Sequence, residues 1–538
     1  MKLWVHNIKL PISEGDELLM KRVAASLGMD AGSIKSARIT RRALDAREKQ
    51  EIHFLLRVLV DLDDAAATAI LKRGNPNVEP YQPETTEPLQ RGAQAMRGRV
   101  VVAGLGPAGL FAAYLLAREG CAPLVLERGD AIEARTKAVG RYWSEGKLDE
   151  ESNVMFGEGG AGTFSDGKLT SRSKDARGDA VLETLVAFGA PEEIAILSKP
   201  HIGTDRLRTV VSNLRREIER LGGEVRFRAT LVGLERDDGR ISRVRIRQNG
   251  AEERLDCASL VLAIGQGARD TYEMLLNAGI ALAPKPFAVG VRMEHPQSMI
   301  NEAQFGAMAG HPRLGAAEYR LTGQSGERGV YTFCMCPGGS VIASASRADE
   351  VVVNGMSNFA RSATNANAAI VVQVRTDDFP AEPLGGVRFQ REMERAAFRA
   401  GGGNAFAPAS SVGAFLRKEA PRGFSGVSPS YRPGVTPTDL WQVLPPFVAA
   451  GVRDGIAAFG RQLKGFDRED AVLTGVETRT SAPLRILRGE DMESVSCAGL
   501  YPVGEGAGYA GGIVSAAIDG MKAAELVIRR YAPPERTV

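Results

Sequence analysis

A glycine-rich turn in the first quarter of the chain carries the clearest chemical signal. A run of apolar residues leads into Gly104, Gly106 and Gly109, which have the spacing GxGxxG and precede a second apolar segment. The first glycine allows a tight turn, the second lets the main chain approach a pyrophosphate, and the third lets a helix pack close to a strand. The helix that begins at Pro107 and Ala108 would point free N–H groups and its positive dipole end at that anion. The turn therefore predicts a dinucleotide site.

Charged side chains beside the next predicted strand, 124–127, extend this site. Glu127 ends that strand, near the roughly 20-residue spacing that is typical of an acid binding a ribose hydroxyl. Arg128 and Arg135 follow and would neutralise a pyrophosphate, although an exposed arginine on a helix often has no specific ligand. We assign all three residues to cofactor binding.

The far end of the chain indicates which dinucleotide is bound. The segment 499–513 contains Gly504, Glu505, Gly512 and Ile513, and it looks like the second FAD motif of the glutathione-reductase-type flavoproteins. In that motif an acid, here Glu505, hydrogen-bonds the ribityl chain, and a helix, here starting at Ile513, faces the flavin. Its dipole would stabilise the negative charge of reduced flavin. We expect FAD as the cofactor.

Further glycines lie between these two motifs. The loop 157–168 is dense in glycine, which suits main chain lying against a flat ring or a phosphate, although a surface turn is the alternative. Its Gly160 and Gly162, together with Val232 and Gly265, complete the expected cofactor contacts. No second strand, GxGxxG and helix unit occurs. Any nicotinamide donor, NADH or NADPH, would therefore approach the flavin only transiently.

Two kinds of side chain outside these motifs are candidates for catalysis. Cys334 and Cys336 lie two apart on a predicted strand, where they would share a face and form a redox pair or present a flavin-facing thiolate. Two small buried side chains are the alternative. His295 follows a strand that would reach the flavin and suits proton transfer near neutral pH, with a structural histidine as the alternative. The chain has no Cys/His spacing typical of a metal site, so we expect no metal.

The order of predicted elements defines the fold class. We expect an α/β protein with a split Rossmann-like FAD-binding domain, a mixed α/β substrate domain inserted into it, and a small ferredoxin-like α+β domain, βαββα, in front. The expected boundaries are 1–82 for the ferredoxin-like domain, 83–97 for a linker, 98–282 and 482–538 for the two FAD-binding segments, and 283–481 for the substrate domain.

Composition limits the partners and the location. In 538 residues, 68 Lys and Arg balance 65 Asp and Glu, so the whole chain shows no charge bias toward nucleic acid or membrane. The basic run 35–49 has no aromatic platform, which makes nucleic acid an unlikely partner. No apolar window reaches the about 18 residues of a membrane span, and five scattered cysteines argue against a disulfide framework. We expect a soluble, cytoplasmic protein with a small-molecule substrate and leave its oligomeric state open.

Four segments together resemble a known family. The segments 157–169, 285–296, 333–339 and 475–481 resemble the bacterial "FAD-dependent dehydrogenase" family of uncharacterised flavoproteins. The resemblance implies FAD, a split Rossmann-like domain and an α/β insert, and it brings no substrate. Three functions agree with it: hydride transfer between a small substrate and FAD, modification of RNA or of a thiol, or redox sensing without catalysis.

Overall fold

The computed structural model describes residues 1–82, 89–171 and 173–532. The predicted linker 83–97 lies partly outside these residues. Its described part, 89–97, is tied to the end of the chain, because Gly92 N donates to Ile528 O at 3.2 Å and Gln94 N donates to Arg530 O at 3.2 Å. Along the described residues, no helix combines the length and the apolar character that a membrane crossing requires.

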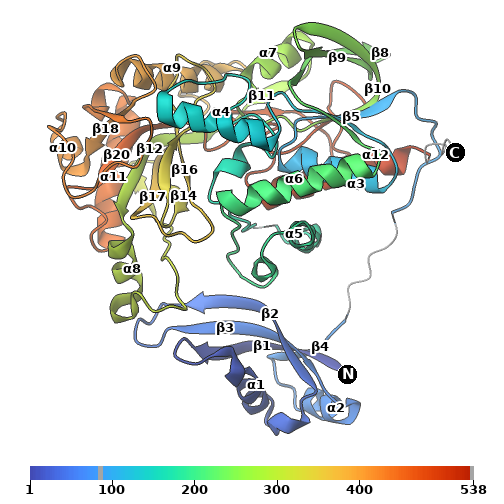
Figure 1. The fold of residues 1–538 in the computed structure, drawn as a ribbon, viewed down its shortest axis with the longest axis vertical. Coiled ribbons are helices and arrows are strands. Elements are labelled where there is room, and N and C mark those ends of the chain that lie inside the picture. The colour runs from blue at the N-terminus through green and yellow to red at the C-terminus, as the bar shows by residue number, and fades with distance from the viewer. Residues whose placement is uncertain (83–88, 172, 533–538) are drawn as a thin grey trace.

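The N-terminal domain is a four-stranded antiparallel sheet with two helices (Figure 1). Leu3, Val5, Leu56 and Val58 are buried at alternate positions of its central strands, so one face of the sheet forms a core under the helices. The sequence prediction of βαββα lacks the last, short strand. In chain order the elements are β1 (Lys2–Pro11), α1 (Leu19–Leu27), β2 (Ser36–Asp45), β3 (His53–Asp61), α2 (Asp64–Lys72) and β4 (Val78–Pro80), and the strand order is β2-β3-β1-β4.

A second sheet builds the nucleotide-binding half from two distant parts of the chain. Its parallel strands run in the order β7-β6-β5-β10-β22, and a hairpin extends β10 on one side. β5 is buried on both faces, as its apolar run predicts. The strands are β5 (Arg99–Ala103), β6 (Leu124–Leu126), β7 (Glu224–Arg226), β8 (Ala229–Asp237), β9 (Arg240–Gln248), β10 (Ala251–Leu262) and β22 (Leu500–Pro502).

Two helices that follow glycine turns pack side by side on this sheet. They are α3 (Pro107–Arg118) and α12 (Ile513–Arg530). A Cβ atom on Gly520 of α12 would lie 2.0 Å from the Ala108 carbonyl oxygen, so the absence of a side chain permits the close packing. The other helices of this half are α4 (Ile132–Glu145), α5 (Arg177–Ala187), α6 (Thr204–Arg220) and α7 (Arg269–Asn277).

A third sheet is mostly antiparallel, and its strands come from the part of the sequence between β10 and β22. Its order is β13-β14-β17-β12-β20-β18-β19. Its strands are β12 (Phe287–Pro296), β13 (Thr322–Ser325), β14 (Arg328–Cys336), β17 (Asn365–Val374), β18 (Ala407–Ser411), β19 (Val435–Pro437) and β20 (Val472–Glu477). Around it lie α8 (Gln297–Phe305), α9 (Gly385–Ala400), α10 (Val412–Arg417), α11 (Pro446–Gln462), and the strand pairs β11 (Leu282–Pro284) with β21 (Leu484–Ile486) and β15 (Ser340–Ala343) with β16 (Val353–Met356).

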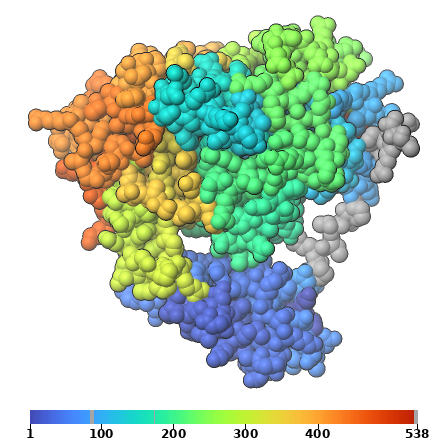
Figure 2. Space-filling model, viewed as in Figure 1, coloured from blue at the N-terminus to red at the C-terminus, as the bar shows by residue number. Residues whose placement is uncertain are grey.

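The N-terminal domain is joined to the rest of the chain along the edge strand β2. Arg42 N donates to Ile196 O at 2.7 Å, and Ser198 N donates to Arg42 O at 2.9 Å. At the end of the hairpin, Lys49 Nζ donates to Ala303 O at 2.8 Å. Figure 2 shows that this domain touches the body over part of its side and is separated from it by an opening elsewhere.

Candidate functional site

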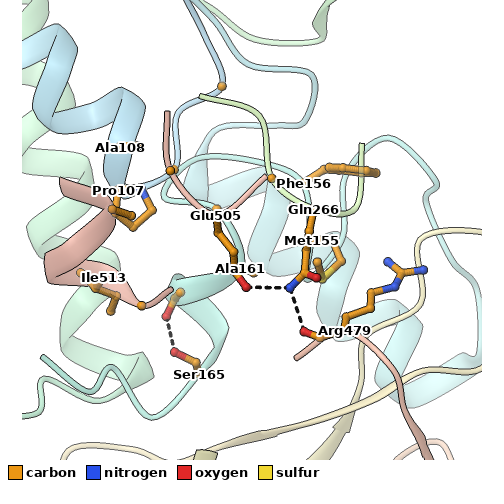
Figure 3. A pocket seen from close by; sticks show the side chains of 18 of the residues that line it. Pro107, Ala108, Met155, Phe156, Ala161, Ser165, Gln266, Arg479, Glu505 and Ile513 are labelled. Atoms are coloured by element: carbon orange, nitrogen blue, oxygen red, sulfur yellow. Dashed lines mark hydrogen bonds between the residues drawn. The ribbon is translucent and has the colours of Figure 1, made fainter. Parts of the chain in front are cut away.

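One cavity of about 570 Å³ lies between the nucleotide-binding half and the third sheet. The nucleotide-binding half contributes the ends of β5, β6 and β10 and the starts of α3 and α12. The facing wall consists of residues 333–336, 344, 353–355, 477 and 479–481. The volume falls within the roughly 300–1,000 Å³ of small-molecule and cofactor sites. Figure 3 shows side chains from both walls around this space.

The three glycines of the GxGxxG turn are required for different structural reasons. Gly104 has a φ of +103°, and a Cβ atom on Gly109 would lie 1.8 Å from the Gly104 carbonyl oxygen, so the protein itself needs both. Gly106 has a φ of −76°, and its Cβ atom would approach only Gly160 Cα, at 3.8 Å. The protein would accept a side chain at Gly106, which lines the cavity. A ligand that approaches the main chain explains its absence, as the sequence predicts.

Two helix N-termini border the same cavity. Gly106 precedes α3 and Gly512 precedes α12, and neither helix has a side-chain hydrogen bond at its N-cap. Pro107, Ala108 and Ile513 line the cavity beside them (Figure 3). Unpaired N–H groups and the positive ends of two helix dipoles therefore favour negative charge in this space. This arrangement suits a pyrophosphate and a flavin ring that gains negative charge on reduction.

Glu127 lines the cavity and also braces its loops. Its side chain accepts hydrogen bonds from Leu105 N at 2.9 Å, Gly129 N at 2.9 Å and Gly157 N at 2.8 Å. These bonds tie the fingerprint turn to the glycine-rich loop that contains Gly160 and Gly162, which both line the cavity. The sequence predicts a ribose contact at Glu127 and does not predict this second role.

Three predicted cofactor contacts differ from expectation. Arg128 lines the cavity, but Asp270 at 2.9 Å and Glu151 at 3.0 Å already compensate its charge. Val232 does not line the cavity, whereas Thr230 and Leu231 of the same strand do.

Arg135 is the third difference, because it is fully buried behind the cavity wall. Burial lowers the pKa of Arg135 to about 10, so the side chain stays charged at neutral pH. It donates hydrogen bonds to five main-chain carbonyls of the loop, those of Asn153, Val154, Gly157, Glu158 and Gly160. Arg135 therefore shapes the loop and does not reach a pyrophosphate.

Glu505 and Gln266 connect the two walls. Gln266 Nε2 donates to Glu505 Oε1 at 2.8 Å and to Arg479 O at 2.7 Å, as Figure 3 shows. Burial raises the pKa of Glu505 to about 7, partly offset by Lys285. The remaining Gln266 oxygen, Oε1, is buried without a partner among the described residues. The sequence analysis missed Gln266, although its place directly after Gly265 in the cavity wall was a usable signal.

A β-bulge separates Cys334 and Cys336. The register of β14 against β17 shifts between Phe333 and Cys336, and Cys334 has a φ of +42°. Both residues line the cavity, but Cys334 is exposed to it while Cys336 is buried. Burial raises the pKa of the Cys334 thiol to about 12 and also raises that of Cys336. The bulge breaks the regular alternation of the strand, but both thiols still line the same cavity, and neutral thiols are favoured over a thiolate.

His295 lies away from the cavity. It is fully buried, its Nε2 is hydrogen-bonded to Phe466 O at 2.7 Å, and its ring packs on the Phe466 ring at 4.9 Å. Burial lowers the pKa of His295 to about 4. The prediction of a catalytic histidine is wrong because packing encloses the ring and no face of it reaches the cavity.

Buried ion pairs hold the wall opposite the glycines. Arg292 is fully buried and forms two hydrogen bonds with Glu477, at 2.9 and 3.0 Å. Nearby, a second cluster joins the nucleotide-binding half to the third sheet, and its members are Arg269, Glu350, Glu394 and Arg479. Arg479 lines the cavity with its charge fully paired. Sequence patterns do not reveal these pairs because their members are far apart in the chain.

The fold and the cavity define a Rossmann-type nucleotide-binding protein, and comparisons with known proteins specify the nucleotide. A family described as "FAD-dependent protein, C-terminal domain-like" matches residues 286–480, and a domain of unknown function (DUF8436) matches residues 1–61. An uncharacterised protein of Clostridium beijerinckii is 45% identical over 540 residues, which cover 99% of this chain and 100% of that protein. The chain belongs to the same family as this relative, its residues 286–480 match the FAD-dependent domain family, and FAD is its cofactor.

Similarity to solved structures is weak. A flavin-dependent brominase is 12% identical, with 80% of this chain and 79% of that chain covered and a TM-score of 0.35. A geranylgeranyl bacteriochlorophyll reductase-like protein from Thermoplasma acidophilum is also 12% identical, with 80% and 77% covered and a TM-score of 0.34. These likenesses assign no activity and no residue role to this chain.

The cavity fits FAD. Gly106 leaves open the space that a Cβ atom would fill, and two uncapped helix N-termini supply main-chain donors. The unpartnered oxygen of Gln266 and the side chain of Glu505 would accept hydrogen bonds from hydroxyl or ring N–H groups. When bound, FAD supplies the capacity to accept or donate a hydride.

Proposed function

We propose that this chain is an FAD-dependent oxidoreductase that transfers a hydride between a small organic substrate and tightly bound FAD. The observation that carries the proposal is the shared cavity, whose one wall fits the cofactor and whose other wall belongs to a different sheet. A second ligand would therefore lie directly against the cofactor, which hydride transfer requires.

In this proposal each wall has a separate task. The FAD-binding segments 98–282 and 482–538 bind the cofactor, and the substrate domain 283–481 closes the other side. Phe333, Cys334 and Asn354 line that side and would contact the substrate. The buried pair of Arg292 and Glu477 would hold this wall in place. Any nicotinamide donor would enter the same cavity transiently.

Anaerobic reduction of the purified holoprotein tests the proposal. The visible absorbance of the flavin would be followed after rapid mixing with NADH, NADPH or single compounds from a panel of small metabolites. Rapid bleaching by one compound, with saturation at high concentration, is the expected result. If no compound bleaches a fully loaded flavin faster than buffer alone does, the chain is not a hydride-transferring oxidoreductase. Redox sensing then becomes the better explanation.

The two cysteines provide the second candidate function, because both line the cavity. Bleaching by a dithiol substrate that disappears in both Cys334→Ser and Cys336→Ser would favour thiol oxidation. Bleaching that survives in both variants would support hydride transfer from a substrate without thiols.

A further inference from the structure

One face of the N-terminal sheet carries an aromatic and basic cluster far from the FAD cavity. Trp4 on β1 is paired with Leu59 on β3, on the face opposite the helices. The Arg57 guanidinium carbon lies 4.5 Å from the centroid of the Trp4 ring. The Tyr81 ring meets Trp4 edge-on, with centroids 5.3 Å apart and planes at 75°. Three planar, partly exposed groups therefore gather on the face opposite the helices.

Unpaired positive charges surround these rings. Arg41 lies directly opposite Arg57 in the β2–β3 register, and Arg38 and Lys9 are paired with β3 residues of the same face. Within residues 1–82, 89–171 and 173–532, none of these four cations forms an ion pair. The Arg41 side chain donates only to Ser198 Oγ, at 3.1 Å. Like charges directly opposite one another destabilise a sheet, so an external anion would stabilise this face.

The acidic side chains of the same face do not supply that anion. Each already has another partner: Asp61 lies 3.6 Å from the N-terminal amine, Asp45 lies 2.5 Å from Arg47, and Glu79 Oε1 is hydrogen-bonded to His6 Nε2 at 2.9 Å. The face therefore combines planar groups that stack with cations that remain available.

We propose that this face binds single-stranded nucleic acid. Unstacked bases pack on aromatic rings and on guanidinium planes, and nearby cations contact the phosphates. Arg57 covers one side of Trp4 and is itself partly exposed. An acidic protein segment would use the cations but has no need for the stacked planar groups. The sequence analysis disfavoured nucleic acid because the basic run 35–49 lacks rings; the sheet brings the rings from β1 and from Tyr81.

Salt-dependent binding of an oligonucleotide to the holoprotein tests the charges. The anisotropy of a fluorescent 12-residue oligouridylate would be measured over a range of salt concentrations. Three or four phosphate contacts predict a slope of log affinity against log salt of about −2 to −3, since each contributes about 0.7. The double variant Arg38→Glu, Arg41→Glu removes two contacts, so the magnitude of the slope should decrease by about 1.4.

A matched charge reversal on the helices is the control. Lys21 on α1 and Lys72 on α2 are exposed and lie on the opposite side of the sheet. Lys21→Glu with Lys72→Glu changes the net charge by the same amount and should leave the slope unchanged. Equal weakening by both double variants would overturn the proposal, because binding would then reflect net charge alone.

The stacked groups are tested separately. Trp4→Ala removes the ring, and Arg57→Met removes the guanidinium plane but keeps an apolar chain on Trp4. Each should weaken binding roughly 5- to 150-fold at constant salt, the range for loss of one stacked base. FAD content and flavin reduction should stay unchanged in both, which separates this proposal from the proposed enzyme. Competition by polyglutamate as effective as that by unlabelled oligonucleotide, or no binding at low salt, would overturn it.

Discussion

The two walls of the FAD cavity are built on opposite principles. The cofactor wall consists mainly of main chain and exists because side chains are absent, as at Gly106 and at Gly512. The facing wall consists of side chains whose charges are paired in the interior, as in Arg292 with Glu477. Adding atoms to the first wall should therefore impair FAD binding. Removing atoms from the second wall should lower the stability of the fold.

Among variants that still fold, the largest expected effect comes from removing one partner of the buried pair. Arg292→Met leaves Glu477 as an uncompensated buried carboxylate, which should lower the free energy of unfolding by about 3–5 kcal/mol. Urea unfolding followed by circular dichroism measures the change. The exposed pair of Arg395 with Asp349 gives the control, because Arg395→Met should cost less than about 1 kcal/mol. Equal effects of the two variants would mean that burial of the Arg292 pair does not hold this wall.

Adding atoms to the cofactor wall should affect FAD binding more than folding. Gly106→Val projects a side chain into the cavity without meeting other protein atoms closely, so FAD affinity should fall at least about a hundredfold. The absorbance of the purified protein and titration with FAD measure the loss. Gly423→Val, at an exposed site with open space around it, should retain FAD.

Gly109→Val sharpens the same distinction within one motif. Its side chain would collide with the Gly104 carbonyl, so this variant should fail to fold and would lose FAD for that reason. A Gly106→Val protein that is yellow and fully loaded would contradict the assignment of the pyrophosphate contact.

The same contrast explains how much the sequence could predict. The cofactor wall follows local rules, so the glycine turn, Glu127, and the start of α12 could be identified from spacing. Arg135 follows Glu127 by eight residues, yet its role depends on a loop that folds back around it. The bulge at Cys334 and the enclosure of His295 arise from pairing with β17 and from packing on Phe466, which no local pattern encodes.

Glu505 lies where the two walls meet, and its titration should give an intermediate effect. Burial raises the pKa of its carboxyl from 4.5 to about 7, so between these pH values the folded protein holds a proton that the unfolded chain has released. Stability of the FAD-free protein should therefore fall as pH rises through this window, by about 3.4 kcal/mol at most.

Glu505→Gln isolates this contribution. The neutral amide should match the wild type near pH 5 and be more stable near pH 8, as measured by urea unfolding of the FAD-free proteins at both pH values. Glu490→Gln, at an exposed position, is the matched control and should follow the wild type throughout. Parallel curves for wild type and Glu505→Gln would show that water or Lys285 compensates the buried charge.

The smallest effect is expected at Cys334, and it decides whether the side-chain wall supplies chemistry or only shape. Cys334 is exposed to the cavity while the four other cysteines are buried, so iodoacetamide should modify it first in the FAD-free protein. Because the protein around the cavity desolvates this thiol and raises its pKa to about 12, the rate should increase about tenfold for each pH unit between 7 and 9. Peptide mass spectrometry measures the rates, and Cys334→Ser should change the free energy of unfolding by less than about 0.5 kcal/mol.

Fast modification at pH 7 without further increase would mean that Arg292 and Lys168 outweigh burial and hold a thiolate. The facing wall would then be reactive, and thiol oxidation would replace hydride transfer from a thiol-free substrate as the better function.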